Sequence, residues 1–131
     1  MSGINCVVVT PESTALDVQA EFVAVPLFDG EKGIAAGHAP MIGRLGYGEL
    51  RVKTSEGERR YYVDGGFVQV TDNTVSIITN RAIDAADVDR AAAEEQLQLA
   101  AKSPVDTDEL LALRDKSVAQ ARAQLKVASR G

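Results

Sequence analysis

The residues of this chain that could do chemistry are few, and His38 is the one in the most unusual setting. It is the only histidine, and the stretch around it, residues 33–50, reads GIAAGHAPMIGRLGYGEL with five glycines and a proline. A general base needs a proton donor within hydrogen-bond reach and a third group that orients it. Asp64, Ser13 and several threonines are available, but none stands in a nucleophile-bearing turn. We therefore expect no enzymatic activity.

Metal and disulfide chemistry are poorly supplied too. One histidine and one cysteine fall short of the ligand set of a typical metal site, so we predict no metal centre. Cys6 has no partner for a disulfide within the chain and stands in the apolar run 4–9. This setting is typical of a buried thiol in a protein from a reducing compartment.

Composition and charge argue against two classes of partner. The chain has 14 basic and 19 acidic residues, a net charge of −5, and an acidic protein lacks the electrostatic footprint of a nucleic-acid binder. No stretch approaches the roughly 20 consecutive apolar residues of a membrane span, and the N-terminus lacks the pattern of a secretory signal. We expect a soluble protein without direct membrane insertion, which can still join a membrane complex through another protein.

The elements that position these residues change in kind near residue 82. Before it, short runs rich in Val, Ile, Thr, Tyr and Phe are separated by turn residues, which is typical of an antiparallel β-sandwich. The expected strands are 4–9, 15–18, 21–26, 48–53, 59–63, 66–70 and 74–79. Turns are expected at 55–58 and 72–73, and a bulge or a corner at Asp64-Gly65-Gly66. Residues 1–83 thus form the predicted β-sandwich domain, with the glycine-rich stretch 33–50 as a docking loop.

Residues 84–131 are predicted to form an antiparallel two-helix hairpin, because Ala, Leu, Gln, Glu, Lys and Arg dominate. Asp84 followed by Asp87 indicates an N-cap and an acidic first turn for a helix over 85–102. A capping box at 106–109 then opens a second helix that ends near residue 128. The expected apolar stripe of the second helix is Leu111, Val118, Ala121, Leu125 and Ala128. Small side chains bury little area, so we expect a weakly held, movable hairpin.

Several motifs in register resemble one family. The pattern GxxxGHAPxxxxLxxGxLRV over 33–52, the run YYVDGGFVQVTDNTVSIITNRA over 61–82 and the Ala-rich hairpin are similar to the epsilon subunit of F-type ATP synthases. The resemblance implies a non-catalytic rotor subunit of the central stalk, which couples c-ring rotation to the catalytic head through the gamma subunit. It also implies a hairpin that folds against the sandwich or extends toward the alpha/beta hexamer and restrains ATP hydrolysis. The implied location is the cytoplasmic face of a bacterial plasma membrane.

The same resemblance assigns the candidate site residues. The residues implied to face the c-ring are Glu31, His38, Met41, Ile42 and Arg44. For His38 the alternative is a local hydrogen bond that shapes the turn. The basic residues after Asp115 are implied to meet an acidic segment of a catalytic subunit, and they are Lys116, Arg122, Lys126 and Arg130.

Some members of that family bind ATP through a motif that the run ADVDRA at 86–91 matches in part. Asp87, Arg90 and Ala91 are kept, and Arg122 stands close to an expected arginine position. Other expected arginine positions hold Leu97, Gln120 and Gln124. A polyphosphate needs several cations or oriented amides, so we predict weak or absent ATP binding and no cofactor. A nucleotide-sensing regulator and a β-sandwich adaptor of another assembly remain the alternative functions.

Overall fold

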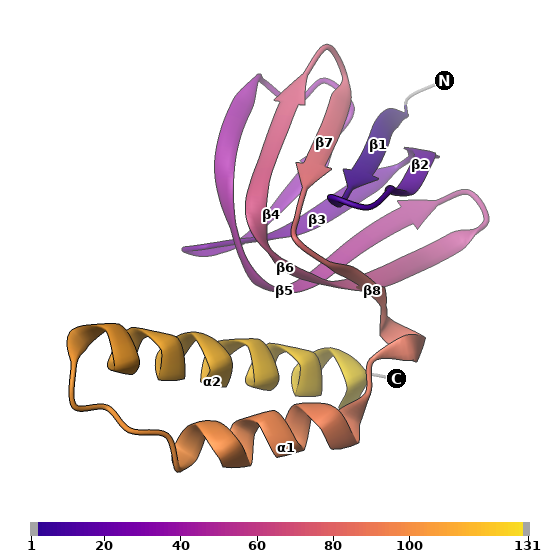
Figure 1. The fold of residues 1–131 in the computed structure, drawn as a ribbon. Coiled ribbons are helices and arrows are strands. Elements are labelled where there is room, and N and C mark those ends of the chain that lie inside the picture. Colours follow the sequence, from indigo (N-terminus) through magenta and orange to yellow (C-terminus); the bar gives the residue numbers. More distant parts are fainter. Residues whose placement is uncertain (1–2, 130–131) are drawn as a thin grey trace.

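The computed structural model describes residues 3–129 and consists of eight strands followed by a short 3-10 helix and two α-helices (Figure 1). The strands are β1 (Ile4–Val9), β2 (Thr14–Ala20), β3 (Phe22–Leu27), β4 (Gly30–Ala35), β5 (Met41–Thr54), β6 (Gly57–Thr71), β7 (Thr74–Ile78) and β8 (Ala82–Asp84). The helices are η1 (Ala85–Asp87), α1 (Arg90–Ala101) and α2 (Asp108–Ser129). The predicted β-sandwich followed by two helices is confirmed.

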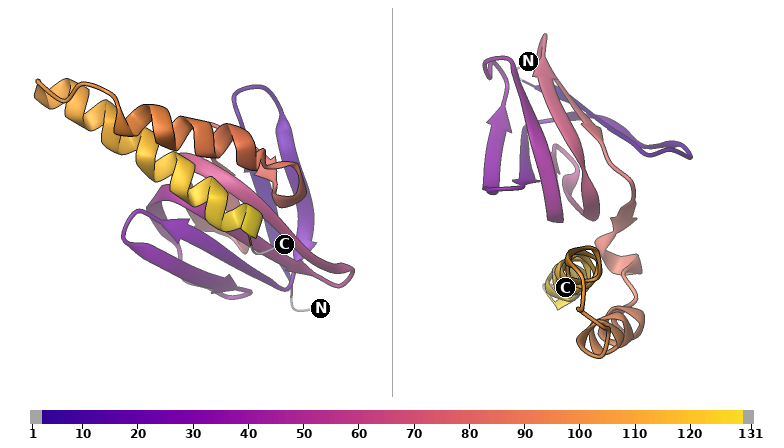
Figure 2. Two further views of the ribbon diagram at one scale, coloured as in Figure 1. Left: turned by 90° about the horizontal axis from the view of Figure 1, so that it is seen from below. Right: turned by 60° about the vertical axis from the view of Figure 1, so that its left-hand side comes forward.

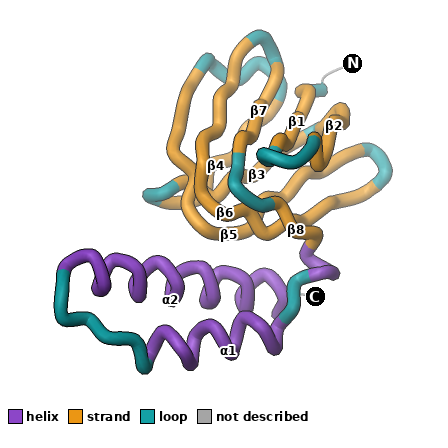
Figure 3. The backbone as a smooth tube through the Cα atoms, in the orientation of Figure 1, coloured by secondary structure: helices purple, strands orange, loops and turns teal. Residues whose placement is uncertain are grey.

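The sheet is built around the long strands β5 and β6. The strand order is β2-β1-β7-β6-β5-β3-β4, and β8 pairs with the other end of β6. Neighbouring strands run antiparallel except β1 and β7, which are parallel. Figure 3 shows how β5 and β6 bend, so that one end of each belongs to the part of the sheet near β7 and the other to the part near β8. One continuous hairpin therefore connects both layers of the sandwich.

The bend in β6 depends on two glycines. Gly65 and Gly66 have φ of +69° and +108°, a region that residues with a side chain rarely adopt. A Cβ at Gly66 would also overlap the carbonyl oxygen of Ile78. The strands β5 and β6 pair without a register shift on either side of these glycines, so the predicted bulge is wrong and the corner offered as its alternative is confirmed. The corner bends one continuous strand, whereas the sequence predicted two strands, 59–63 and 66–70. The turns at 55–58 and 72–73 are confirmed by the pairings Thr54 with Gly57 and Thr71 with Thr74.

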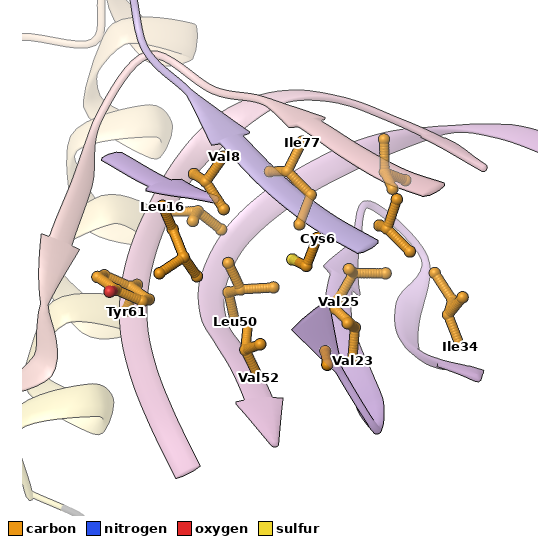
Figure 4. Packing of buried hydrophobic residues seen from close by; sticks show 14 of the residues in the cluster. Cys6, Val8, Leu16, Val23, Val25, Ile34, Leu50, Val52, Tyr61 and Ile77 are labelled. Carbon is orange, nitrogen blue, oxygen red and sulfur yellow. The ribbon is translucent and has the colours of Figure 1, made fainter. Parts of the chain in front are cut away.

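The core lies between the layers and is lined by alternate residues of each strand (Figure 4). In β1 the buried residues are Ile4, Cys6 and Val8, which follow the period of two that a half-buried strand requires. In β6, Val68 and Val70 are buried while Phe67 and Gln69 are exposed, which follows the same period. Burial raises the pKa of the Cys6 thiol to about 12, and the negative charge of Asp17 adds to the effect.

The glycine-rich stretch 33–50 is mostly strand, so the prediction of a loop is wrong. Only residues 36–40 form a turn between β4 and β5, and β5 pairs with β6 from Met41 onward. The glycines serve packing inside the sandwich: a Cβ on Gly48 would come within 2.9 Å of Pro26, and one on Gly46 within 3.2 Å of the Leu27 carbonyl oxygen. The strand β4 was not predicted, because its two glycines read as breakers.

The two helices form an antiparallel hairpin that lies across one side of the sandwich (Figure 2). α2 lies between the sheet and α1 and contacts β5 and β6. The predicted N-cap is wrong: Asp84 caps only the 3-10 helix, through a hydrogen bond from Ala86 N, whereas Asp89 caps α1 by accepting from Ala92 N. The buried residues of α2 are Ala121, Gln124 and Val127. Of the predicted stripe, Ala121 is buried, Val118, Leu125 and Ala128 are half-buried, and Leu111 is exposed.

Candidate functional site

An apolar surface covers the outward side of strands β5, β6 and β7. Ile42, Phe67 and Ile78 are 75%, 57% and 51% exposed, and Phe67 pairs directly with Ile78 across the strands. Arg44 pairs with Phe67 on the other side, so these four side chains adjoin on one face, here called the β5–β7 face. A group of exposed large apolar side chains on a sheet is typical of a protein docking surface.

Phe28 extends this face at the turn between β3 and β4. Its ring is 70% exposed, and the Arg44 guanidinium carbon lies 4.6 Å from the ring centroid. Phe28 N also donates to the Arg44 carbonyl oxygen at 2.8 Å. A guanidinium over an aromatic face gains cation–π attraction and keeps its hydrogen-bond donors available. Arg44 is therefore held in place while it remains able to bind an anionic or carbonyl group of a partner.

His38 lies in the turn 36–40 at one end of the sandwich. Its backbone N donates to the Ala35 carbonyl oxygen at 3.1 Å, and its Nδ1 lies 2.7 Å from the Ala39 carbonyl oxygen. The side chain of Asn73 fixes the same turn, because its Oδ1 accepts from Gly37 N at 3.0 Å. The local hydrogen bond that the sequence analysis offered as an alternative for His38 is thus present.

Glu31 lies at the other end of β4, so the structure separates it from His38. Its Oε1 lies 3.0 Å from Nη2 of Arg51 on β5. Arg51 also approaches Glu49, whose Oε2 lies 2.6 Å from Nη2 of Arg60 on β6. Arg60 Nη2 in turn donates to the Val127 carbonyl oxygen near the end of α2 at 2.8 Å. A chain of charged contacts therefore runs from the Glu31 edge to the hairpin.

The centre of the contact between hairpin and sandwich is a buried carboxylate. Asp64, on β6, is 5% exposed and accepts from Gln120 Nε2 with both oxygens, at 3.0 and 3.2 Å. Arg81 Nε lies 3.1 Å from Asp64 Oδ2. Next to this cluster, burial raises the pKa of the Tyr62 hydroxyl to about 12, and the charge of Asp64 acts in the same direction.

The candidate phosphate-binding residues do not come together. Arg90 lines a hollow with Arg59 and Arg60, whereas Arg122 lines a different one between the helices with Arg114. Glu58 and Asp84 also line the first hollow and lower its attraction for an anion. Asp87 and Ala91 are exposed at the start of the hairpin. Gln120, at an expected arginine position, instead contacts Asp64.

Of the basic tail residues, Lys116, Arg122 and Lys126 are exposed on α2, and Arg130 lies outside the described residues. Lys126 also lines a hollow of about 270 Å³ between α2 and the sheet, together with Glu31 and Glu49. Within residues 3–129, no cluster of three or more His, Cys, Asp or Glu side chains could hold a metal ion. None of the helices described is long and apolar enough to cross a bilayer.

The sequence analysis missed the residues that connect the hairpin to the sandwich, namely Asp64, Arg60, Arg81 and Gln120. Asp64 was read as part of a bulge or a corner, and nothing local in the sequence connects it to a glutamine 56 positions later. The β5–β7 face was only partly anticipated. Phe67 is the residue that could have indicated this face in the sequence. It is an aromatic residue on the side of an alternating strand that carries polar residues when it faces water.

A β-sandwich followed by a two-helix hairpin defines the structural class of this chain. Residues 3–85 match the family model described as ATP synthase, Delta/Epsilon chain, beta-sandwich domain. The ATP synthase epsilon chain of Rhodopirellula baltica is 52% identical over 124 residues, which cover 95% of this chain and 97% of that one. The sodium ion specific ATP synthase epsilon chain of Propionigenium modestum is 32% identical over 130 residues, 98% and 95% of the two chains. The chain belongs to the family of ATP synthase epsilon chains.

Two solved structures share the fold. One similar structure is a chain of the Euglena gracilis mitochondrial ATP synthase, solved as OSCP/F1/c-ring in rotational state 1. The two chains superpose with a TM-score of 0.85 at 22% identity, and the match covers 98% of this chain and 82% of that chain. A chain of the Tetrahymena thermophila mitochondrial ATP synthase, from the central stalk and c-ring, gives 0.76 at 17% identity and covers 95% of both chains. At these identities the likeness concerns the fold alone, including the hairpin after the sandwich.

Proposed function

We propose that this chain is a non-catalytic central-stalk subunit of a proton- or sodium-translocating F-type ATP synthase. The observation that carries the proposal is the 52% identity to an ATP synthase epsilon chain over 95% of this chain. The two structures of similar fold come from assemblies that include a c-ring, which supports the same placement. In this role the chain is peripheral, at the cytoplasmic face of a bacterial plasma membrane, and couples c-ring rotation to the catalytic head.

The proposed partners of the β-sandwich are the gamma subunit and the c-ring. Glu31, His38, Met41, Ile42 and Arg44 remain the candidates for the ring-facing surface, and they lie on β4, on β5 and in the turn between them. Because Glu31 and His38 lie at opposite ends of β4, this surface is elongated. The β5–β7 face adjoins it through Ile42 and Arg44. The remaining exposed apolar side chains of this face, Phe67 and Ile78, suit a permanent subunit contact, which we assign to gamma.

The proposed role of the hairpin is to restrain ATP hydrolysis when it leaves the sandwich and reaches the alpha/beta hexamer. The exposed cations Lys116, Arg122 and Lys126 give α2 a positive charge that fits an acidic segment of a catalytic subunit. We expect no cofactor in this role, because Arg90 and Arg122 line separate hollows.

The test is deletion of residues 104–131 in the assembled enzyme. We expect assembly to stay intact, judged by co-purification with gamma and the alpha/beta hexamer, and the ATPase rate to rise. A variant in which Lys116, Arg122 and Lys126 are all replaced by Gln should raise the rate in the same direction, with a smaller difference from wild type at high salt, because salt screens the attraction. An unchanged rate in both variants would remove the inhibitory role.

A further inference from the structure

The hairpin is attached to the sandwich mainly by polar contacts. Of the three buried residues of α2, two are the small apolar residues Ala121 and Val127 and the third is Gln124. Small side chains remove little apolar area from water, so burial alone holds α2 weakly. The directional contacts are the hydrogen bonds from Gln120 to Asp64 and from Arg60 to the Val127 carbonyl oxygen. Each of these hydrogen bonds has one charged partner and is stronger than a neutral one. The Asp64 side chain is 7% exposed and that of Arg60 is 18% exposed, so we take the more buried charge, Asp64, as the main attachment point.

The β-sandwich retains a partner for the buried carboxylate when α2 undocks. A buried charge that loses its only partner is strongly destabilising, which would make the attachment permanent. Asp64 has a second partner, Arg81, which belongs to the segment between β7 and β8 and stays with the sandwich. The Arg81 side chain is 48% exposed, so water reaches this pair from the side. When Gln120 leaves, Asp64 therefore keeps its counterion and exchanges one amide donor for water.

Gln96 on α1 positions the amide of Gln120. Gln96 Nε2 donates to the Ser117 carbonyl oxygen at 2.9 Å and to Gln120 Oε1 at 3.4 Å. With its oxygen held by Gln96, the Gln120 amide directs its Nε2 group toward Asp64. Both helices thus contribute to one contact with the sheet, although only α2 touches the carboxylate.

We propose that Asp64, Gln120 and Arg81 form a releasable latch that sets the fraction of molecules in which the hairpin is docked on the sandwich, with Gln96 as a positioning residue. The inference rests on the proposed function, in which the undocked hairpin is the inhibitory state. The latch is a neutral amide that donates to both oxygens of a carboxylate, so its strength comes from short-range, charge-assisted hydrogen bonds without an ion pair between α2 and Asp64.

Hydrogen exchange of the full chain tests the latch directly. Gln120→Ala removes the donor and leaves intrinsic helix propensity no weaker, because Ala is the best helix former. Most of the stability of a helix in a protein comes from tertiary packing, so α2 opens more often once it loses its contact with the sheet, and its amides exchange faster. We expect the amides of residues 112–129 to exchange about tenfold to a hundredfold faster in this variant, and those of β1 and β7 to be unchanged. Gln98→Ala, on the exposed side of α1, is the matched control and should leave exchange as in wild type.

A second variant separates electrostatics from packing. Gln120→Glu has nearly the same shape but places a carboxylate against Asp64, so we expect faster exchange than in Gln120→Ala. The latch is overturned if the amides of residues 112–129 exchange at the same rate in wild type and in both variants. It is also overturned if they exchange at the wild-type rate in Gln120→Glu alone. In the assembled enzyme, Gln120→Glu should lower the ATPase rate by favouring the undocked hairpin. Faster exchange with an unchanged ATPase rate keeps the latch and removes the inhibitory role, so the two failures are distinguishable.

Discussion

Arg51 Nη2 lies 3.0 Å from Glu31 Oε1, so a side chain proposed to face the c-ring is already paired inside its own subunit. The Glu31 side chain is 52% exposed, and exposed ion pairs contribute little to stability. The pair therefore orients Glu31 without making the fold depend on it. A partner that offers a better cation can replace Arg51 at low cost.

The first prediction concerns this pair. Glu31→Gln should change the free energy of unfolding by less than about 1 kcal/mol, because water screens the lost attraction. In the assembled enzyme the same variant should weaken the coupling of ATPase activity to ion pumping if Glu31 meets the ring. Chemical denaturation and pumping assays measure the two effects, with Lys32→Gln on the same strand as control. A loss of stability above about 2 kcal/mol would make Glu31 a structural residue instead.

The second prediction concerns the β5–β7 face. Phe67→Ser should leave the stability of the isolated chain within about 0.5 kcal/mol, because the ring is exposed and its removal leaves no cavity. It should weaken binding to the gamma subunit by about 2 kcal/mol if Phe67 is a central contact. Isothermal titration of gamma with each variant measures this. Gln69→Ala, two residues along the same face, is the control, and equal losses in both variants contradict a contact centred on the apolar residues.

The third prediction concerns ATP. Titration of the purified chain with ATP by calorimetry should give no binding at micromolar concentrations. The reason is geometric: Arg60 is engaged by Glu49 and the Val127 carbonyl oxygen, and Arg122 lines a different hollow from Arg90. Micromolar affinity that is lost in Arg90→Ala would revive the nucleotide-sensing alternative.

The fourth prediction is that the free energy of unfolding falls at alkaline pH because the Cys6 thiol ionises more readily in the unfolded chain. The thiol pKa is 9.0 in the ordinary case and about 12 in the fold. Below pH 9 the thiol is protonated in the folded and in the unfolded chain. Above pH 9 the unfolded chain loses this proton while the folded chain keeps it. The free energy of unfolding therefore falls as the pH rises toward 12. Between about pH 8 and about pH 11 this contributes a loss of about 3 kcal/mol.

Cys6→Ala should lower stability at neutral pH by creating a small cavity but remove this part of the alkaline loss. Urea unfolding at several pH values measures both. Tyr62, whose pKa is also raised to about 12, keeps its own contribution above pH 10 in either chain and serves as an internal reference. Parallel pH profiles for the two chains would contradict the assigned origin.

The sequence allowed much of the sandwich to be predicted, because period-two burial is a local property. In β6, the buried Val68 and Val70 alternate with the exposed Phe67 and Gln69. β4 was missed because glycine is read as a breaker, whereas here Gly33 sits under the ring of Phe22, where no Cβ would fit. Only the path of a neighbouring strand reveals that role.

The start of the first helix and the attachment of the hairpin could not be predicted for a different reason. Asp84 and Asp89 are both suitable N-caps, and the pairing of β8 with β6 decides that the chain is still extended at Asp84. The contact of Asp64 with Gln120 joins residues 56 positions apart, and no periodicity encodes it. Tertiary packing rather than local propensity fixes both.

The unbroken course of β6 has a mechanical consequence. Phe67 on the docking face and Asp64 at the latch are three residues apart on this strand, about 10 Å in an extended chain. Covalent bonds and the ladder with β5 connect them, with no loop in between. The bend at Gly65 and Gly66 lies between the two residues, so these glycines are the most flexible part of the backbone that joins the β5–β7 face to the hairpin contact.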